Sequence, residues 1–337
     1  MHDSSEAKTE AKTEAKTEAK TEAKTEAKTE AKTEAKTEAK TEAKTDTVFK
    51  EVALFLCAAF GLAWLSVMPL WIDERGLEAP YATPLMVVMM FTPLLASLVV
   101  HLAFRPGDLK EAFALRLNRK MWKPMLASWF TPMPLVLLSI FLAALLGWYT
   151  LDLQNISALQ AILDDAAPGT ELPFSLSVLV PLMVLQSAAL APLNMFATIG
   201  EELGWRGFLH HRLRTKMSLS ATSVVTGVIW GLWHTPILLL GYNYPAHTSA
   251  GPLLFVVFCV LISFPLGALR ERTSSTLPAI LAHAAINASA GLMAILHHVD
   301  HPPDAAFAGI IGVSGWILLL PVIVISITWG RGAKIPS

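Results

Sequence analysis

The sequence contains no Asp, Glu, Lys or Arg between Ala221 and Leu269. A domain that folds in water could hardly keep so long a segment without charge, whereas a segment that crosses a bilayer is expected to lack it. Of the 337 residues, 53% are hydrophobic and 16% are charged, and the mean hydropathy is +0.50. The chain is therefore predicted to be an integral membrane protein.

Much of the charge lies at the N-terminus, where the first 45 residues hold 21 of the 53 charged side chains. From Glu6 to Thr45 the tetrapeptide Glu-Ala-Lys-Thr is repeated ten times. Like charges recur at i+4, opposite charges recur at i+2, and no apolar face exists, so this spacing works against a stable helix. We predict a low-complexity, disordered or marginally helical tail over 1–47, with partner binding as its alternative role, and a membrane domain over 48–337.

Apolar segments long enough to span a bilayer as helices, which takes about 20 residues, recur through the rest of the chain. They predict an all-α, polytopic bundle of about eight transmembrane helices. The approximate spans are 48–72, 84–104, 123–149, 174–200, 220–240, 252–270, 277–297 and 308–329.

Lys and Arg are distributed unevenly among the connections between these spans. They are concentrated in the connections 105–123, 201–219 and 271–276 and in the C-terminal residues. The alternate connections, at 73–83, 150–173, 241–251 and 298–307, contain Arg75 as their only basic residue of the Lys or Arg type. Because basic residues are retained on the cytoplasmic side, the sequence predicts a multi-pass protein of the cell membrane with its N- and C-termini in the cytoplasm.

Ionisable residues within or at the edges of predicted membrane spans are costly and indicate function. The first group is Glu201, Glu202 and Arg206. On a helix Glu202 and Arg206 are four residues apart and can form an ion pair, whereas Glu201 points about 100° away. We expect Arg206 to hold Glu202 and to leave Glu201 available for another role.

Two further groups lie on later spans. His234 follows Trp230 at i+4 in the uncharged stretch, and His283 and Asn287 share one helical face. A carboxylate, two imidazoles and a carboxamide can activate water and stabilise an oxyanion, and glutamate and histidine are also zinc ligands. The residues alone predict a polar membrane cavity that is either catalytic or transporting.

The ordered motifs Glu-Glu-x-x-x-Arg, aromatic-x-x-x-His and His-x-x-x-Asn resemble those of the CPBP family of intramembrane proteases. That family includes CAAX prenyl proteases of the Rce1 type and bacterial Abi or bacteriocin-immunity proteins. The motif core covers 175–297. The family pattern has Phe where this chain has Trp230, which affects the shape of the pocket rather than an ionisable group.

The resemblance implies an α-helical membrane endopeptidase whose cavity is reached from the cytoplasmic side and the membrane. Glu201 and His234 would activate the attacking water, and His283 with Asn287 would hold the oxyanion. The remaining pair, Glu202 and Arg206, would position the site.

The sequence offers two forms of this chemistry. If a metal is present, its ligands are Glu201, His234 and His283, but that use removes the base and an oxyanion donor together. A His-Glu-x-x-His helix is absent from the sequence. We therefore expect a glutamic-type peptidase that requires no cofactor, with a metallo-type zinc enzyme as the alternative.

The function predicted from these features is hydrolysis of a peptide bond near the cytoplasmic membrane face. The partners are membrane lipid and a peptide or protein substrate: a prenylated CAAX protein, a pheromone or bacteriocin-like peptide, or the tail of another membrane protein. A net charge of −1 and the lack of a basic stripe exclude nucleic acid. The competing predictions are a transporter that uses the same polar groups and a non-catalytic immunity or scaffold protein.

Overall fold

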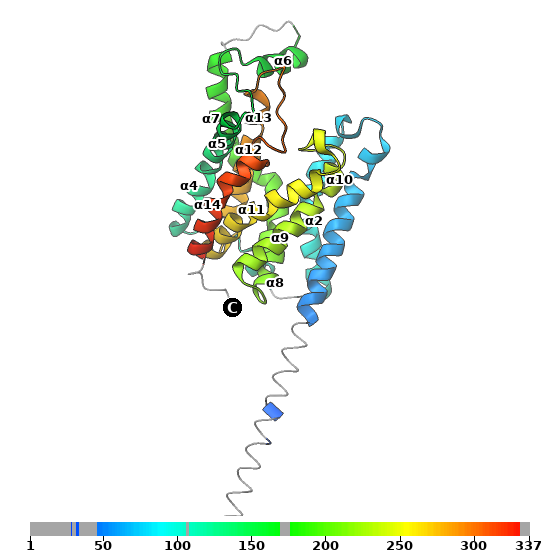
Figure 1. Cartoon of the computed structure of the whole chain (residues 1–337). Coiled ribbons are helices and arrows are strands. Elements are labelled where there is room, and N and C mark those ends of the chain that lie inside the picture. The colour runs from blue at the N-terminus through cyan, green and yellow to red at the C-terminus, as the bar shows by residue number, and fades with distance from the viewer. Residues whose placement is uncertain (1–27, 29–31, 34–45, 106–107, 169–175, 331–337) are drawn as a thin grey trace, which may run out of the picture. The chain divides into compact units, whose positions relative to one another are not determined.

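The computed structural model describes residues 28, 32–33, 46–105, 108–168 and 176–330. The chain divides into two compact units, 1–52 and 53–337. Nearly all of the repeat tail lies outside the described residues, so its disorder and its boundary at residue 47 stay predictions. The account below concerns the second unit (Figure 1).

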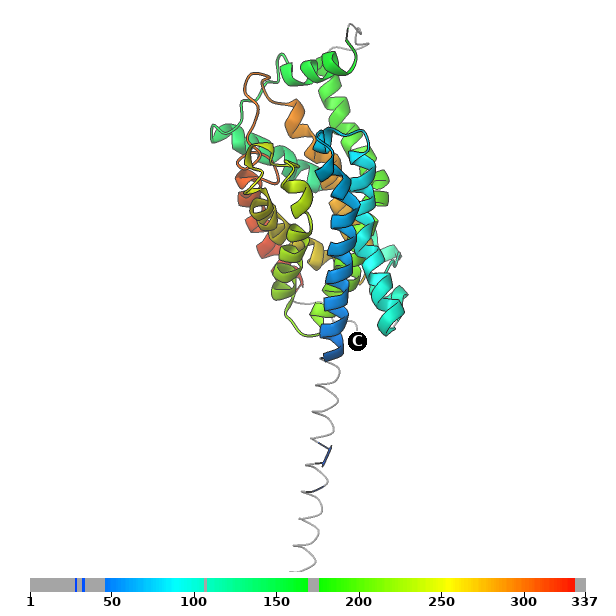
Figure 2. The ribbon, with the colours of Figure 1, turned by 90° about the vertical axis from the view of Figure 1, so that its right-hand side faces the viewer.

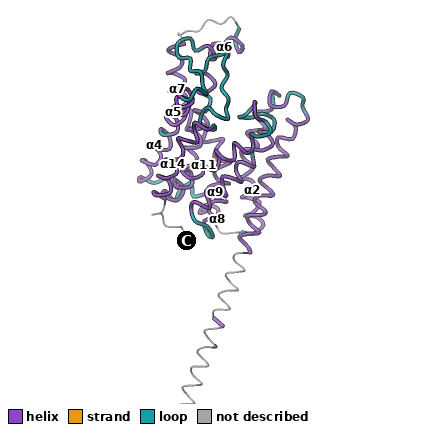
Figure 3. Tube along the Cα trace, viewed as in Figure 1, coloured by secondary structure: helices purple, strands orange, loops and turns teal. Residues whose placement is uncertain are grey.

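The described part of the second unit is built from helices, which confirms the all-α prediction, and Figure 3 draws it as helices and loops only. The apolar segments are Asp46–Ile72, whose residues up to Val52 belong to the first unit, α2 (Ala82–Phe104), α4 (Trp122–Phe130) followed by α5 (Pro132–Leu145), α7 (Leu176–Glu202), α9 (Leu219–Trp233), α11 (Gly251–Thr273), α12 (Leu277–Ala290) and α14 (Val313–Gly330). The shorter helices are η1 (Gly76–Glu78), α3 (Leu109–Phe113), η2 (Arg119–Met121), α6 (Ser157–Ala166), η3 (Leu203–Leu209), α8 (His210–Arg214), α10 (Thr235–Leu238), η4 (Pro245–His247) and α13 (Leu292–Ile295).

Seven helices in the described part of the chain are long and apolar enough to cross a membrane. The fifth predicted span, 220–240, is not among these seven, because it is not one continuous helix. It consists of the 15-residue helix α9 and the short α10, and His234 lies between them. Pro236 stands in the first turn of α10, where its missing N–H costs nothing. The polytopic helical bundle is confirmed, and the fifth span is broken at a candidate site residue.

The fourth predicted span, 174–200, is longer than the sequence indicates. The helix runs from Val178 to Arg214 through the π-helix η3. The expected connection 201–219 is therefore reduced to a short turn after Arg214. Glu201 and Glu202 lie inside the helical segment instead of in a loop, and Arg206 is completely buried.

Close helix packing places the site. Helix α9 packs against α11, α7 packs against α12, and α2 packs against α7. Gly227 and Gly231 allow the first of these contacts. A Cβ at Gly227 would lie 2.4 Å from the Cα of Val260 on α11, and a Cβ at Gly231 would lie 2.5 Å from the Cα of Val256. Small residues serve this purpose in membrane bundles. The α9–α11 and α7–α12 pairs thus bring the three motif-bearing helices together around α11.

The connections of the second unit lie at two opposite ends of the bundle. Figures 1 and 2 show α6, α10 and α13 at one end and α8 with the last residues of α14 at the other. The long helices run between these ends, so each motif residue can be assigned to one half of the bundle.

Candidate active site

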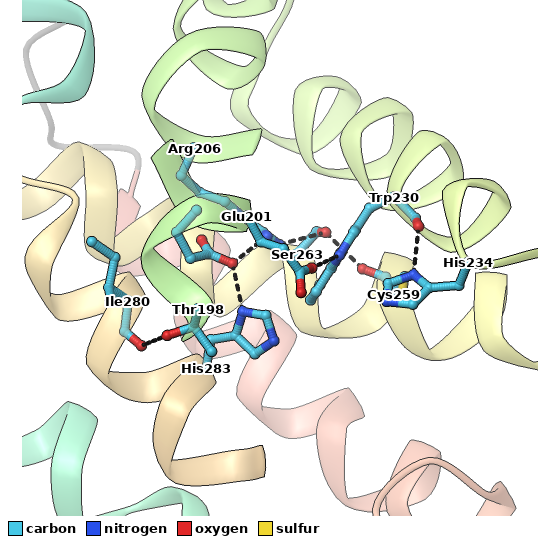
Figure 4. A network of polar contacts seen from close by, with 10 residues as sticks. Thr198, Glu201, Arg206, Trp230, His234, Cys259, Ser263, Ile280 and His283 are labelled. Carbon is cyan, nitrogen blue, oxygen red and sulfur yellow. Dashed lines mark hydrogen bonds and ion pairs between the residues drawn. The ribbon is translucent and has the colours of Figure 1, made fainter. Parts of the chain in front are cut away.

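Glu202, the last residue of α7, is held in a fully buried ion pair. Its Oε1 lies 2.8 Å from Nη1 of Arg206, and both side chains have no exposed area. The i+4 pairing predicted from the sequence is thus confirmed. Nη2 of Arg206 donates a hydrogen bond of 3.0 Å to Oγ of Ser263 on α11, and Ser263 in turn donates to the carbonyl of Cys259 at 2.6 Å (Figure 4).

Glu201 has different surroundings from those of its neighbour. Its Oε2 accepts a hydrogen bond of 2.7 Å from Nε1–H of Trp230, and the residue is 2% exposed. The ring of Trp230 also lies 4.4 Å from the guanidinium of Arg206, within the range of a cation–π interaction. Trp230 therefore orients one oxygen of Glu201 and covers the cation that holds Glu202.

His283, on α12, has one ring nitrogen fixed by Glu202. Its Nδ1 lies 2.9 Å from Oε1 of Glu202, the oxygen that Arg206 also contacts. A carboxylate that is paired with Arg206 can only accept, so Nδ1 of His283 carries a hydrogen. Nε2 is then the ring nitrogen that remains for a ligand, as an acceptor in the neutral ring or as a donor in the imidazolium.

His234 is fixed in the same way by the backbone. Its Nδ1 lies 2.9 Å from the carbonyl oxygen of Trp230, four residues earlier at the end of α9. A carbonyl only accepts, so Nδ1 again carries the hydrogen and Nε2 of the neutral ring has the lone pair. The ring packs edge-on against Trp233 and Phe255 at centroid distances of 4.6 and 4.7 Å. Its orientation is therefore fixed by packing as well as by the hydrogen bond.

A cavity of about 220 Å³ lies among α2, α9, α11 and α12 and joins these groups. Its wall includes Glu201, Trp230, His234, His283 and Asn287. The wall does not include Glu202 or Arg206, which lie behind it. The structure therefore brings the four residues predicted as catalytic to one cavity and leaves the two predicted as positioning residues outside it.

Sequence reasoning missed three residues of this site. Ser263 lies in the apolar helix α11, where Ser and Thr commonly bond to their own helix, so its contact with Arg206 had no signal in the sequence. Tyr242 and Asn243, from the connection between α10 and α11, also line the cavity. Asn243 has a left-handed backbone (φ 64°), which Asn tolerates better than most residues.

The zinc alternative fits this geometry poorly. Within the described residues, no three His, Cys, Asp or Glu side chains gather closely enough to hold a metal ion. Glu201, His234 and His283 therefore share a cavity wall without forming the three-ligand set that a catalytic zinc needs.

Comparisons with known proteins match the part of the chain that contains the site. Residues 182–289 match the model of the type II CAAX prenyl endopeptidase Rce1-like family. The matched segment is similar to that family over about a third of the chain. It contains all six predicted site residues, from Glu201 to Asn287.

A curated protein is also similar to part of this chain. A protein of Methanococcus maripaludis named CAAX prenyl protease 2 is 32% identical over 109 residues, which are 31% of this chain and 40% of the relative. The chain thus spans about two fifths of the length of that relative.

Proposed function

We propose that the protein is an intramembrane endopeptidase that hydrolyses a peptide bond with water activated by Glu201. The observation that carries the proposal is the contrast between the two adjacent glutamates. Glu202 is fully buried and ion-paired outside the cavity, whereas Glu201 lines the cavity and accepts a hydrogen bond from the neutral Nε1–H of Trp230. The match to the Rce1-like family supports the same reaction class.

In this mechanism the water loses its proton to Glu201 as its oxygen attacks the scissile carbonyl carbon. Nε2 of His234, which has the lone pair, accepts a hydrogen bond from the second O–H of the water and orients it, and that hydrogen stays on the attacking oxygen. Trp230 keeps the Glu201 carboxylate in place through the hydrogen bond to Oε2. The proton taken by Glu201 then passes to the leaving amine as the C–N bond breaks.

The tetrahedral oxyanion lies on the other side of the cavity, at α12. The side-chain amide of Asn287 donates one hydrogen bond to it. His283 can donate a second from Nε2 only as the imidazolium, because the hydrogen on Nδ1 is directed at Glu202. The Glu202 carboxylate, itself fixed by Arg206, is positioned to stabilise this positive ring.

We further propose that both termini lie in the cytoplasm, from the distribution of Lys and Arg. The substrate is a lipidated or hydrophobic protein or peptide. C-terminal processing of the CAAX type is the candidate suggested by the relative's name.

The test is cleavage of fluorogenic peptides, with and without an isoprenoid, by detergent-purified protein. We expect the wild type to cut at least one peptide and the folded Glu201→Gln variant to cut none. Equal cleavage by both proteins removes Glu201 from the mechanism. Transport without cleavage, or an immunity function that survives loss of Glu201 and His283, supports one of the competing functions instead.

A chelator tests the metal question in the same assay. We expect full activity after treatment with EDTA and dialysis. Inactivation that zinc specifically reverses would show that the glutamic-type mechanism is wrong.

A further inference from the structure

Tyr242 lines the active-site cavity together with Glu201 and Asn287, but it takes no part in the reaction steps described so far. It lies in the connection between α10 and α11. Its backbone N–H donates a hydrogen bond of 3.1 Å to the carbonyl of Ile237. Its phenol oxygen, in contrast, has no hydrogen-bond partner among the described residues. The hydroxyl of Tyr242 is therefore available to a ligand in the cavity.

Tyr244, two residues later, uses its hydroxyl in the opposite way. Its phenol donates a hydrogen bond of 2.8 Å to the carbonyl of Ile311, and the residue is 1% exposed. Tyr242 is 37% exposed. A buried tyrosine usually finds a partner for its hydroxyl, as Tyr244 does. One tyrosine of this connection thus holds the structure together, and the other keeps its hydroxyl free.

The backbone on both sides of Tyr242 has an uncommon conformation. Gly241 and Asn243 have positive φ angles of 98° and 64°. Such conformations persist where the surrounding structure holds them, and they are frequent at functional sites. The same connection is also tied to the segment before α14, since Nε2 of His247 lies 2.7 Å from Oδ2 of Asp304. Tyr242 is therefore carried by an anchored turn.

The phenol of Tyr242 lies within the electrostatic field of Glu201. Partial desolvation raises the pKa of Tyr242 above its usual range, and the charge of Glu201 raises it further. Because a phenol ordinarily titrates near pH 10, this hydroxyl keeps its hydrogen at neutral pH. It is a neutral donor in a cavity of about 220 Å³, where a small group bound at the centre is close to every wall.

We propose that the Oη–H of Tyr242 donates a hydrogen bond to the tetrahedral oxyanion. This role rests on the proposed function, which supplies the hydrolysis. The hydrogen stays on Oη, so no proton is transferred. The contact adds to the one from Asn287 and, unlike a contact from Nε2 of His283, does not require a charged imidazole.

A donor of this kind acts mainly in the transition state. The carbonyl oxygen of the intact substrate carries less charge than the oxyanion, so the hydrogen bond strengthens as the charge develops. Loss of the hydroxyl should therefore reduce kcat and leave KM unchanged.

The matched variants Tyr242→Phe and Tyr244→Phe test this role, because each removes one hydroxyl and keeps the ring. Both are made in the full-length protein and compared with the wild type by cleavage of a fluorogenic apolar peptide and by unfolding in mixed micelles. We expect Tyr242→Phe to lower kcat about 10²-fold, the usual loss when one oxyanion donor is removed, and to unfold like the wild type. Tyr244→Phe should lose stability, since the carbonyl of Ile311 loses its partner, with a much smaller change in kcat.

Two kinetic results would contradict the proposal. A raised KM with unchanged kcat in Tyr242→Phe would show that the hydroxyl binds the substrate and the transition state equally. Wild-type values of both constants would show that it contacts neither. A loss of stability in Tyr242→Phe as large as that in Tyr244→Phe would assign it a structural role instead.

Binding of a peptide phosphonate separates the role of Tyr242 from the hydrolysis itself. The phosphonate places a tetrahedral, anionic group at the position of the scissile bond and is not cleaved. We expect Tyr242→Phe to weaken its binding about 10-fold or more, while binding of the parent peptide, measured in the Glu201→Gln background, stays the same.

The two assays distinguish failure of this role from failure of the proposed function. If Tyr242→Phe weakens phosphonate binding but the wild type cuts no peptide, the oxyanion contact stands and the peptidase function fails. Cleavage by the wild type with equal phosphonate affinity in both proteins rejects the contact alone. A wild type that neither cuts the peptide nor binds the phosphonate rejects both.

Discussion

The two adjacent glutamates should respond in opposite ways to the same substitution. Glu202→Gln removes the negative charge that neutralises Arg206, and both side chains are completely buried. Breaking a buried ion pair by neutralising one partner costs about 3–5 kcal/mol, because the other charge stays uncompensated in a region of low dielectric. We expect a loss of stability of this size.

Glu201→Gln should leave the stability within about 1 kcal/mol of the wild type, as expected for a change that breaks no ion pair. The amide oxygen of the new side chain can still accept the 2.7 Å hydrogen bond from Trp230. Its amide cannot take a proton from water, so the rate should fall by about 10²–10⁴-fold, the usual contribution of a general base.

Both variants are compared with wild type by reversible unfolding in mixed micelles and by peptide cleavage. The double variant Glu202→Gln/Arg206→Met is the control, because removal of both charges should restore part of the stability. The reasoning is refuted if Glu201→Gln is the destabilised variant, or if Glu202→Gln unfolds like the wild type.

Three smaller predictions follow from other contacts. Ser263→Ala should lower kcat about 10-fold or more with little change in KM, since a hydrogen bond to a charged group is worth about 1.5–3 kcal/mol. Ser263→Thr keeps the hydroxyl and should retain activity. An equal loss of activity in both variants would indicate a packing effect. Gly204→Ala should destabilise the protein by about 1–3 kcal/mol in the same unfolding assay, because its Cβ would lie 2.3 Å from Cβ of Pro93; wild-type stability would refute the packing argument. Hydrogen bonds from Ser157 and from backbone N–H groups hold the pKa of Asp152 below its usual range. The stability that this carboxylate contributes is complete above its unfolded pKa of about 4 and is lost as the pH falls below it, so amide exchange at Ser157 should accelerate in acid in the wild type and much less in Asp152→Asn.

The span pattern was predictable because the apolar segments are long and the charge is confined between them. The break at His234 was not, since the residues from Ala221 to Leu240 read as one uncharged run. Hydropathy measures the cost of placing side chains in lipid and carries no information on where the backbone stops being helical. The length of the α7 segment was missed for a related reason. A charged residue such as Arg206 is assigned to a loop from the sequence, and only the structure shows that it is buried and paired with Glu202.

The site was predictable to the extent that helical spacing determines contacts. The pairing of Glu202 with Arg206 follows from i+4 spacing alone. The contact of His283 with the same glutamate joins residues 81 positions apart and depends on the packing of α7 against α12. Ser263 and Tyr242 come from a helix and a connection without a motif, so tertiary structure was needed to find them.

The irregular backbone of the bundle is concentrated at the motif residues. The π-helix η3 begins directly after Glu202, α9 ends at the residue before His234, and α12 ends three residues after Asn287. Interrupted helices at membrane depth leave backbone N–H and C=O groups without their helical partners, which a bilayer tolerates only where those groups are buried in protein or line a polar cavity. The interruptions and the polar side chains lie around one cavity, which is the space that water and a peptide could enter. Hydrolysis inside a membrane requires the same space, and this links the unusual helices to the proposed reaction independently of the motifs.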